Sequence, residues 1–386
     1  MFLARTSLFS SRVTLVLLAI SIAAGAGFQI ANTANLHAFS VALVEEGLTR
    51  GAGDVRVESR DGAMVRDGDS LATQLQAVPG VIATIPVLVY PGAVGSKGRF
   101  VGTPVYGIGA TTMPPYHVLE GSGLAHGDHE GILLGSSLAK RLGAKAGDSI
   151  ELRVIYGAPG ASLDDDNLGR FTVIVRGVVG GTGGAYRFAY VDRAFLAHES
   201  GALHGASEIL VHLADHEAAT TTAAQISAQF PGVVATGWRE DDPYLPNYLG
   251  ANKTIGTVSY AMVVAAVSVP MWALLYIHVL KRRREIGILV ALGFGRGEVF
   301  AIYLLQALVV VAIGCVIGAL LGLALILYFQ AHPLFEWETL VVRPAIAFAV
   351  FVGPAAAITL TAVIAGSYPA WRAARTDPAQ VLRRLE

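Results

Sequence analysis

The sequence predicts an α-helical membrane protein with four transmembrane helices and one large extracytoplasmic α+β domain, which is inserted between the first and second helices. Three observations lead to this fold class. The chain of 386 residues is 53% hydrophobic and only 15% charged, whereas charged residues make up roughly 25% of soluble domains. The charges are missing from four long stretches, and Lys and Arg cluster in the segments before the first stretch, between the second and third, and after the fourth.

The four charge-free stretches are each long enough for a helix to cross the hydrocarbon core, which takes about 20 apolar residues. The stretches are 13–44, 254–280, 299–335 and 344–371. The spans predicted within them are 13–31, 256–279, 300–328 and 346–367. The resulting segments are 1–31 (cytoplasmic N-terminus and first helix), 32–254 (outer domain), 255–280 (second helix), 281–298 (cytoplasmic loop), 299–329 (third helix), 330–344 (short outer loop), 345–367 (fourth helix) and 368–386 (cytoplasmic basic tail).

The first span has an alternative interpretation as a cleaved signal peptide. Arg5 and Arg12 precede an apolar run, and Ala24–Ala26 resembles a small-residue cleavage site. The apolar character continues through Phe28 and Ile30, which is long for a signal sequence. The sequence therefore favours a retained helix.

The basic residues near the span ends predict the orientation, because cytoplasmic loops carry an excess of Lys and Arg. They cluster before the first span, between the second and third spans, and after the fourth span. The segment 32–254 has 16 basic and 23 acidic residues, a net charge of −7. We therefore expect this segment outside the cytoplasm, and the whole chain as a multi-pass membrane protein.

The outer segment has the pattern of an α+β domain, in which short β-branched runs alternate with helical patterns and turns. The expected strands include Val55–Val57, Val81–Tyr90, Ile150–Tyr156 and Phe171–Val179. The expected helices are Ser70–Ala77 with Asp69 as its N-cap, Ser136–Leu142 and Ala218–Phe230.

Residues that suggest chemistry are few. The polar group His117, His126, Asp128, His129 and Glu130 is a candidate metal cluster, but its spacing matches no common site and a solvated turn is the alternative. Asp164–Asp166 lacks the remaining ligands of a calcium loop. With a net charge of −1 and one cysteine, Cys315, the chain gives no indication of nucleic-acid binding or of a disulfide framework. We expect no catalytic residue and no metal, so an enzyme is a distant alternative.

The cytoplasmic loop 281–298 reads KRRREIGILVALGFGRGE. Ile286, Leu289 and Val290 lie at helical spacing, and Gly293 and Gly295 end the pattern. This predicts a short amphipathic helix at the membrane surface. The alternative is a basic stop-transfer cluster with a connecting turn.

Three runs of the chain resemble one family, the MacB/LolE/FtsX-type ABC permeases, also called type VII or mechanotransmission transporters. They are Arg284–Gly293 in the cytoplasmic loop, Ser367–Leu382 at the C-terminus, and Leu134–Asp148 in the outer domain, which looks like the MacB periplasmic core domain. The one-plus-three arrangement of spans is also similar. Val290 and Trp371 depart from the family pattern, where basic residues are usual. The resemblance is greatest to the lipoprotein-releasing LolC/LolE-like permeases.

The resemblance implies a permease subunit of a bacterial inner membrane, with its large domain in the periplasm. This subunit would relay ATPase motion to the outer side and release or export lipoproteins or other amphipathic substrates. Because the sequence has no Walker A pattern, ATP and Mg would be bound by a separate cytosolic ABC ATPase. The implied coupling residues are Arg284, Glu285, Ile286, Leu289, Val290, Leu292 and Gly293. The other implied partners are a second permease chain (identical or not), membrane lipids at the basic tail, and a lipoprotein or periplasmic adaptor. A MacB-like tripartite efflux permease and an FtsX-like transmembrane regulator are the alternatives.

Two further groups of residues are expected to have roles within the membrane. The glycines at 314, 318 and 322 have the four-residue spacing that lets helices approach closely in lipid. An apolar cavity for acyl chains is expected at the outer ends of the first two spans. Its predicted lining is Phe28, Ile30, Leu36 and Phe39 facing Ile255, Val258 and Met262.

Overall fold

The computed structural model describes residues 12–374 except for 63, 97, 110, 112–113, 157–166, 182–183, 242–243, 282–293 and 339. The chain divides into two compact units, which we describe separately. The helical unit comprises Met1–Ser40, Gly250–Leu334 and Val342–Glu386. The globular unit comprises Val41–Leu249 and Phe335–Val341.

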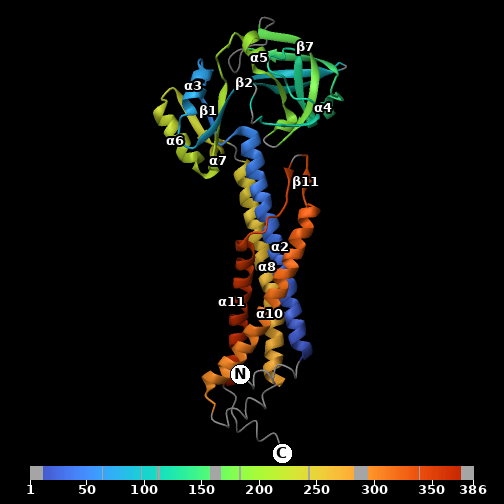
Figure 1. The fold of residues 1–386 in the computed structure, drawn as a ribbon, viewed down its shortest axis with the longest axis vertical. Helices are drawn as coiled ribbons and strands as arrows, with labels where there is room; N and C mark the ends of the chain where they lie inside the picture. The colour runs from blue at the N-terminus through green and yellow to red at the C-terminus, as the bar shows by residue number, and fades with distance from the viewer. Residues whose placement is uncertain are drawn as a thin grey trace, which may run out of the picture. The chain divides into compact units, whose positions relative to one another are not determined.

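Long helices build the helical unit (Figure 1). They are α2 (Arg12–Val44), α8 (Tyr244–Lys281), α10 (Arg296–Ala331) and α11 (Phe348–Ala374). Three helical stretches are long and apolar enough to cross a membrane, namely Leu15–Leu48, Tyr244–Ala273 and Phe300–Ala331. The apolar stretch Phe348–Thr361 is shorter, so the fourth span stays a prediction.

Helices α2 and α8 continue well past the ends of the predicted spans at 31 and 256. At 1.5 Å per residue, the 33 residues of α2 extend about 50 Å, against roughly 30 Å of hydrocarbon. Polar residues such as Asn32 and Asn252 mark where the predicted spans end, but they do not end the helices. The predicted limits of the outer domain, 32 and 254, therefore fall within helices.

One ten-stranded sheet organises the globular unit, in the order β10-β1-β9-β2-β3-β8-β5-β7-β4, with β6 paired to β2 and β7. The strands are β1 (Val55–Ser59), β2 (Val81–Ser96), β3 (Arg99–Ile108), β4 (His117–Gly121), β5 (Gly131–Gly135), β6 (Ser149–Ile155), β7 (Leu168–Gly180), β8 (Ala189–Asp192), β9 (Glu208–Leu213) and β10 (Val233–Gly237). The helices are the π-helix η2 (Glu45–Ala52), α3 (Gly68–Leu75), α4 (Ser136–Leu142), η4 (Ala185–Arg187), α5 (Arg193–Ser200), η5 (His216–Ala218), α6 (Ala219–Gln229) and α7 (Trp238–Asp241).

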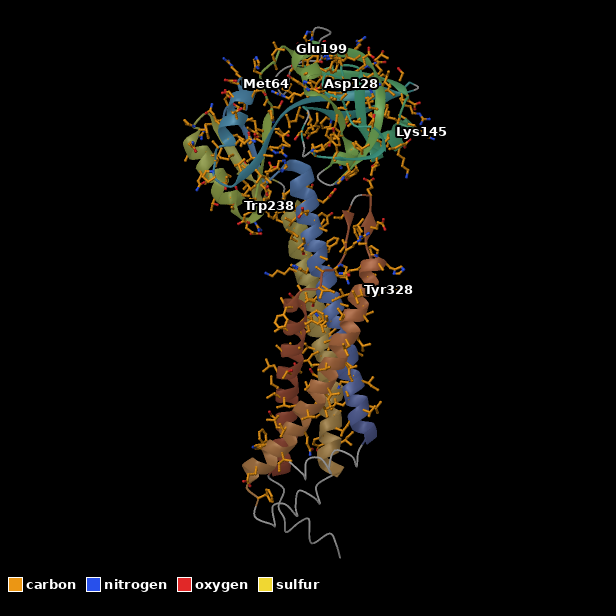
Figure 2. The ribbon with its side chains drawn as sticks, in the orientation of Figure 1. Met64, Asp128, Lys145, Glu199, Trp238 and Tyr328 are labelled. Carbon is orange, nitrogen blue, oxygen red and sulfur yellow. The ribbon has the colours of Figure 1, made fainter. Side chains whose placement is uncertain are left out.

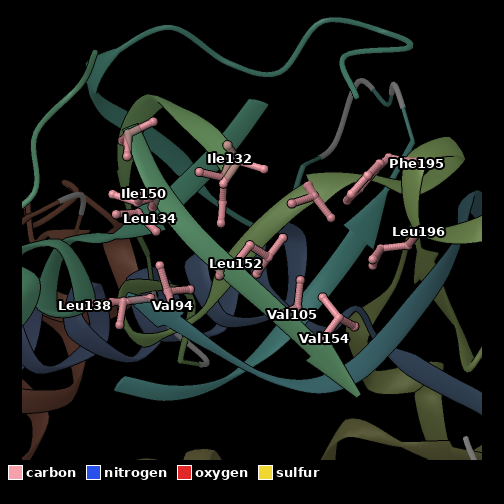
Figure 3. Close-up of a cluster of buried hydrophobic side chains, with 14 of the residues drawn as sticks. Val94, Val105, Ile132, Leu134, Leu138, Ile150, Leu152, Val154, Phe195 and Leu196 are labelled. Carbon is pink, nitrogen blue, oxygen red and sulfur yellow. The ribbon is translucent and has the colours of Figure 1, made fainter. Parts of the chain in front are cut away.

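Side chains of this sheet and of its helices form two main hydrophobic cores. The larger core joins β5, β6 and α4, and it contains fully buried side chains such as Leu134 and Leu152 (Figure 3). The second core joins β1, β9, α3 and α6. The 16-residue strand β2 belongs to both halves, because it pairs with β9 near Val87 and with β6 near Val94.

The local predictions for this unit are close to the observed elements. Helix α4 has the predicted bounds and ends at Gly143, whose φ of 64° is the left-handed conformation that glycine adopts without strain. The N-cap prediction for α3 was wrong, because Asp69 lies inside the first turn. Its carboxylate accepts from Arg193 at 2.7 Å instead.

The predicted short loop 330–344 contains a hairpin of β11 (Glu336–Trp337) and β12 (Leu340–Val341). Although this hairpin lies between α10 and α11 in the sequence, it belongs to the globular unit.

Candidate functional site

The glycines of α10 lie against α2. A Cβ on Gly318 would come within 2.6 Å of the Ala26 Cβ and 2.9 Å of the Ala23 carbonyl oxygen. Gly314 and Gly322 approach Ile22 and Ile30 of α2 in the same way. The helix backbones therefore pack in direct contact along a seam that only small residues allow.

Polar side chains join α2 to α8. The Asn252 amide donates to the Leu36 carbonyl oxygen at 2.8 Å and to the Ser40 hydroxyl at 2.7 Å. The Asn32 amide donates to the Ser259 hydroxyl at 3.0 Å. Helix α2 is thus bonded to α8 on one face and packed on α10 on another.

The residues predicted to line an acyl-chain cavity are dispersed. Ile30 is only 1% exposed and packs on Gly322, so it does not belong to that lining. The physical reason is that Phe28 and Ile30 are two residues apart, about 200° around a helix, and Phe28 is 54% exposed. The side chain of Leu36 lies next to Gly256, and Phe39 is half-buried.

The residues of α8 in that predicted lining are all exposed. They are Ile255, Val258 and Met262, with exposed fractions of 60%, 53% and 67%. These side chains are therefore available to lipid, to a ligand or to another helix.

The strongest candidate for a functional site is the part of the globular unit from which the chain leads into two long helices. We call it the junction, and it consists of η2, β1, β9, β10 and α7 with the side chains that join them. Helix α2 continues through η2 into β1, and β10 continues through α7 towards α8. Strands β1 and β10 are antiparallel neighbours, from Val55 opposite Gly237 to Ser59 opposite Val233. Both helices are therefore attached to one two-stranded ribbon.

A buried carboxylate organises this junction. Asp54, which is fully buried, accepts from the backbone N–H of Leu213 at 2.7 Å, and its other oxygen lies 2.5 Å from the His216 ring. The Trp238 indole donates to the His216 carbonyl oxygen at 3.0 Å, and the Trp238 N–H donates to the Asp54 carbonyl oxygen. Trp238, labelled in Figure 2, thus fixes the start of β1 to the end of β10.

Charged groups strengthen the same ribbon. Arg56 on β1 pairs with Glu208 of β9 at 2.9 Å and with Asp241 of α7 at 3.0 Å. Burial raises the pKa of Glu208 despite the nearby guanidinium. Burial also raises the pKa of the neighbouring Tyr106 to about 12. Arg56 therefore links strand β1 to strand β9 and to helix α7.

The π-helix η2 is held on two sides. Glu46 pairs with His117 at 3.0 Å, and Leu48 is 2% exposed in the core that also contains Trp238. His212 is buried beside this segment, and burial lowers the pKa of its imidazole. A π-helix is a rare backbone conformation, and π-helical turns occur often at functional sites. The η2 segment is therefore a candidate functional element of the junction.

The hairpin makes a separate contact within the globular unit. The Ser136 hydroxyl donates to the Glu338 carboxylate at 2.6 Å. Glu338 has a φ of +50°, which is uncommon for a residue other than glycine. The segment between α10 and α11 is therefore anchored on α4.

The polar residues weighed as a metal cluster have other partners. His117 binds Glu46, Asp128 forms a two-point pair with Arg176, and His129 lies against the Phe195 ring. Within the described ranges, no three metal-ligating side chains come together. Asp164–Asp166 and all the predicted coupling residues from Arg284 to Gly293 lie outside the described residues.

Sequence reasoning missed the junction, because its members are far apart in the chain. Asp54 and His216 are 162 residues apart, and neither belongs to a recognisable motif. The one local signal is Gly53–Asp54 directly before a β-branched run.

Apolar helices long enough to cross a membrane, in one chain with an α+β unit, define a class of protein, the membrane proteins that carry a large globular domain. Residues 13–229 match the MacB-like periplasmic core domain, and residues 257–378 match the FtsX-like permease C-terminal domain. The chain belongs to the MacB/FtsX family of ABC transporter permeases, which work with an ATPase.

Relatives support this assignment over parts of the chain. An uncharacterized ABC transporter permease of Methanocaldococcus jannaschii is 29% identical over 33% of this chain and 32% of its own length. The macrolide export ATP-binding/permease protein MacB of Nitrosomonas europaea is 35% identical over 26% of this chain and 14% of its own length. The macrolide export ATP-binding/permease protein MacB of Chromobacterium violaceum is 33% identical over 29% of this chain and 16% of its own length. The matches thus span a third or less of each relative.

The solved structures that match part of this chain include the extracellular domain of the noncanonic ABC-type transporter YknZ from Gram-positive bacteria. It has a TM-score of 0.35 and 13% identity, and the match covers 48% of this chain and 100% of that chain. The periplasmic region of MacB from Actinobacillus actinomycetemcomitans has a TM-score of 0.35 and 14% identity. That match covers 50% of this chain and 93% of that chain.

Proposed function

We propose that this chain is the permease subunit of an ABC transporter of a bacterial inner membrane, in which α2 and α8 carry ATPase-driven motion into the globular unit. The observation that carries this proposal is the β1–β10 ribbon, to which both helices are attached. Its buried bonds at Asp54, Arg56 and Trp238 resist independent movement of the two strands. The two strands of the ribbon are therefore expected to move together as one body.

The proposed substrates are lipoproteins or other amphipathic molecules, which the permease releases or exports from the membrane. The exposed apolar side chain of Phe28 supports an apolar substrate. Removing an acyl chain from lipid costs about 0.8 kcal/mol per CH₂, so such a substrate requires an apolar surface and external energy. Macrolide-type efflux with a periplasmic adaptor is the second candidate, which the names of the two MacB relatives favour.

The ATPase partner is expected to dock on the loop that contains Glu285 and Leu289. The test is affinity purification of the tagged full chain from mild detergent, followed by mass spectrometry. We expect a P-loop ATPase to co-purify with the wild type, and to be lost with Glu285→Ala combined with Leu289→Asp.

The matched control makes the same changes on the globular unit, as Glu199→Ala combined with Leu203→Asp, and Leu203 is 61% exposed there. We expect this variant to retain the ATPase. Retention by the loop variant, or equal loss from both variants, would contradict the proposed docking loop. An acylated protein in the wild-type sample would support lipoprotein release, and a periplasmic adaptor would support efflux.

A second copy of the chain is the proposed partner of α8. Among the exposed positions on this helix, one set follows alternating spacings of four and three residues, which is the period of a left-handed seam between two helices. They are Ala251, Ile255, Val258, Met262, Ala265, Val269 and Trp272. In a Cys315→Ser background, Val258→Cys should form disulfide-linked dimers in membranes, whereas Thr257→Cys on the neighbouring exposed face should not. Equal cross-linking at both positions, or none at Val258, would exclude this seam.

A further inference from the structure

The globular unit contains a cavity of about 230 Å³ that is separate from the junction. Three elements line it, namely β3 at Gly102–Pro104, α4 at Ser137, Leu138 and Arg141, and η4 with the residue that follows it, at Arg187–Phe188. All three elements belong to the globular unit.

The two arginines of this cavity have no carboxylate partner. Among the described residues, neither Arg141 nor Arg187 forms an ion pair, and Glu338, which accepts from Ser136 on the first turn of α4, pairs with neither. Other arginines of the unit are paired with a carboxylate: Arg56, Arg153, Arg176, Arg193 and Arg239. The Arg187 guanidinium lies 5.9 Å from the centre of the Tyr186 ring. In a segment with a net charge of −7, two guanidinium groups that have no carboxylate partner among the described residues form a local positive site.

The backbone that carries both arginines is fixed. The Thr103 hydroxyl donates to the Arg187 carbonyl oxygen at 3.0 Å, and the Arg187 N–H donates to the Gly184 carbonyl oxygen at 2.8 Å. Arg141 lies in α4. The neighbouring residues Leu138 and Leu142 of this helix are 2% and 3% exposed in the larger core, which holds the helix in place. A fixed backbone lowers the entropy that is lost when side chains close on a ligand.

The chemistry of the lining defines the ligand. Guanidinium groups bind phosphate through paired N–H donors, and a phosphate monoester carries a charge of about −1.5 to −2 at pH 7, which two arginines balance. Pro104 and Phe188 supply an apolar wall. The volume is below the ~300–1,000 Å³ typical of drug-sized ligands, so the ligand is small.

We propose that this cavity binds a phosphate monoester that carries a short apolar group, with Arg141 and Arg187 holding the phosphate. Binding here does not depend on the proposed transport, because it needs only the globular unit's own residues. The phosphate belongs either to a free ester or to the headgroup of a lipid.

The test is isothermal titration calorimetry of the full chain in a non-ionic maltoside detergent, with two probes. Hexyl phosphate represents a free ester, and dihexanoyl phosphatidic acid represents a lipid headgroup. We expect at least one probe to bind, and its Kd to rise at least tenfold in the double variant Arg141→Ala/Arg187→Ala. The probe with the lower Kd identifies the source of the phosphate.

Two further variants make the result specific. Gly102→Val keeps both charges and adds an apolar side chain to the lining, where its Cβ meets only the Gly92 carbonyl oxygen, at 3.9 Å. We expect this variant to weaken binding at least tenfold. The matched charge control is Arg66→Ala/Arg99→Ala, which removes two exposed arginines elsewhere on the unit and should leave the Kd unchanged. Absence of binding by both probes, or binding that is equal in the wild type and the Arg141→Ala/Arg187→Ala variant at equal melting temperature, would overturn the proposal.

Discussion

The two units of this chain differ in the residues that make their closest contacts and in the residues that they expose. In the helical unit the closest contacts involve small residues such as Ala26 and Gly318, while Leu320 and Phe348 are 63% and 84% exposed. In the globular unit large side chains such as Leu152 are fully buried, and charged side chains cover the surface (Figure 2). Lipid removes the hydrophobic reason to bury leucine and leaves backbone packing to join helices, whereas water requires leucine inside.

The largest expected effect tests the small-residue seam. Gly318→Leu should prevent α2 and α10 from packing, because its Cβ alone would overlap Ala23 and Ala26. Overpacking costs about 1–3 kcal/mol in ordinary cores, and here two backbones must separate, so we expect loss of folded protein in a detergent gel-filtration assay. The matched control is Gly353→Leu on α11, where a Cβ meets nothing within 4 Å. Equal recovery of both variants would contradict the seam.

The next prediction compares leucines between the units. Leu152→Ala should destabilise the globular unit by roughly 2–5 kcal/mol, because it leaves a cavity in the larger core. Leu320→Ala, at an exposed helical position, should change stability by less than about 0.5 kcal/mol. Thermal unfolding in detergent, followed by limited proteolysis, measures both. A larger effect at Leu320 would show that its side chain packs against protein rather than lipid.

A smaller effect is expected where polar bonds join the helices. Asn252→Ala removes two hydrogen bonds from α8 to α2, which should cost roughly 1–3 kcal/mol. Asn247→Ala, at an exposed position of the same helix, is the control and should have little effect. Equal melting temperatures of the two variants would mean that the Asn252 bonds do not stabilise the helix pair.

The smallest effect concerns pH in the globular unit. The hydrogen bonds from Arg176 hold the pKa of Asp128 below its ordinary value of 3.8. The folded state therefore gains stability from this carboxylate above that value and loses it as the pH falls below it. Asp128→Asn should lower the melting temperature slightly at pH 7, and the difference from wild type should vanish under acid conditions. The exposed Asp67→Asn control should match the wild type throughout, and a pH-independent difference for Asp128→Asn would contradict the ion pair.

The sequence predicts the helical unit better than the junction, for physical reasons. Missing charges reveal long apolar helices directly, and the spacing of Gly314, Gly318 and Gly322 predicts a seam. That α2 lies on this seam comes only from the structure, because spacing does not specify a partner. The assignment of Ile30 to a cavity failed because position along a helix was used without direction around it.

The junction depends on contacts between distant parts of the chain. Nothing near Asp54 in the sequence indicates that His216 and Leu213 are its partners. The same holds for Glu338 and Ser136, which are 202 residues apart. Strand alternation predicts the elements of an α+β unit, but the pairing of β1 with β10 is a property of the folded sheet.

The central claim is that the membrane separates the globular unit from the cytoplasmic loop, and single-cysteine labelling tests it most directly. In a Cys315→Ser background, Lys145→Cys and Gly297→Cys each place one thiol at an exposed position. A membrane-impermeant maleimide applied to spheroplasts should label the Lys145→Cys variant and should label the Gly297→Cys variant only after lysis. Labelling of the Gly297→Cys variant in unbroken spheroplasts, or protection of the Lys145→Cys variant, would contradict the account.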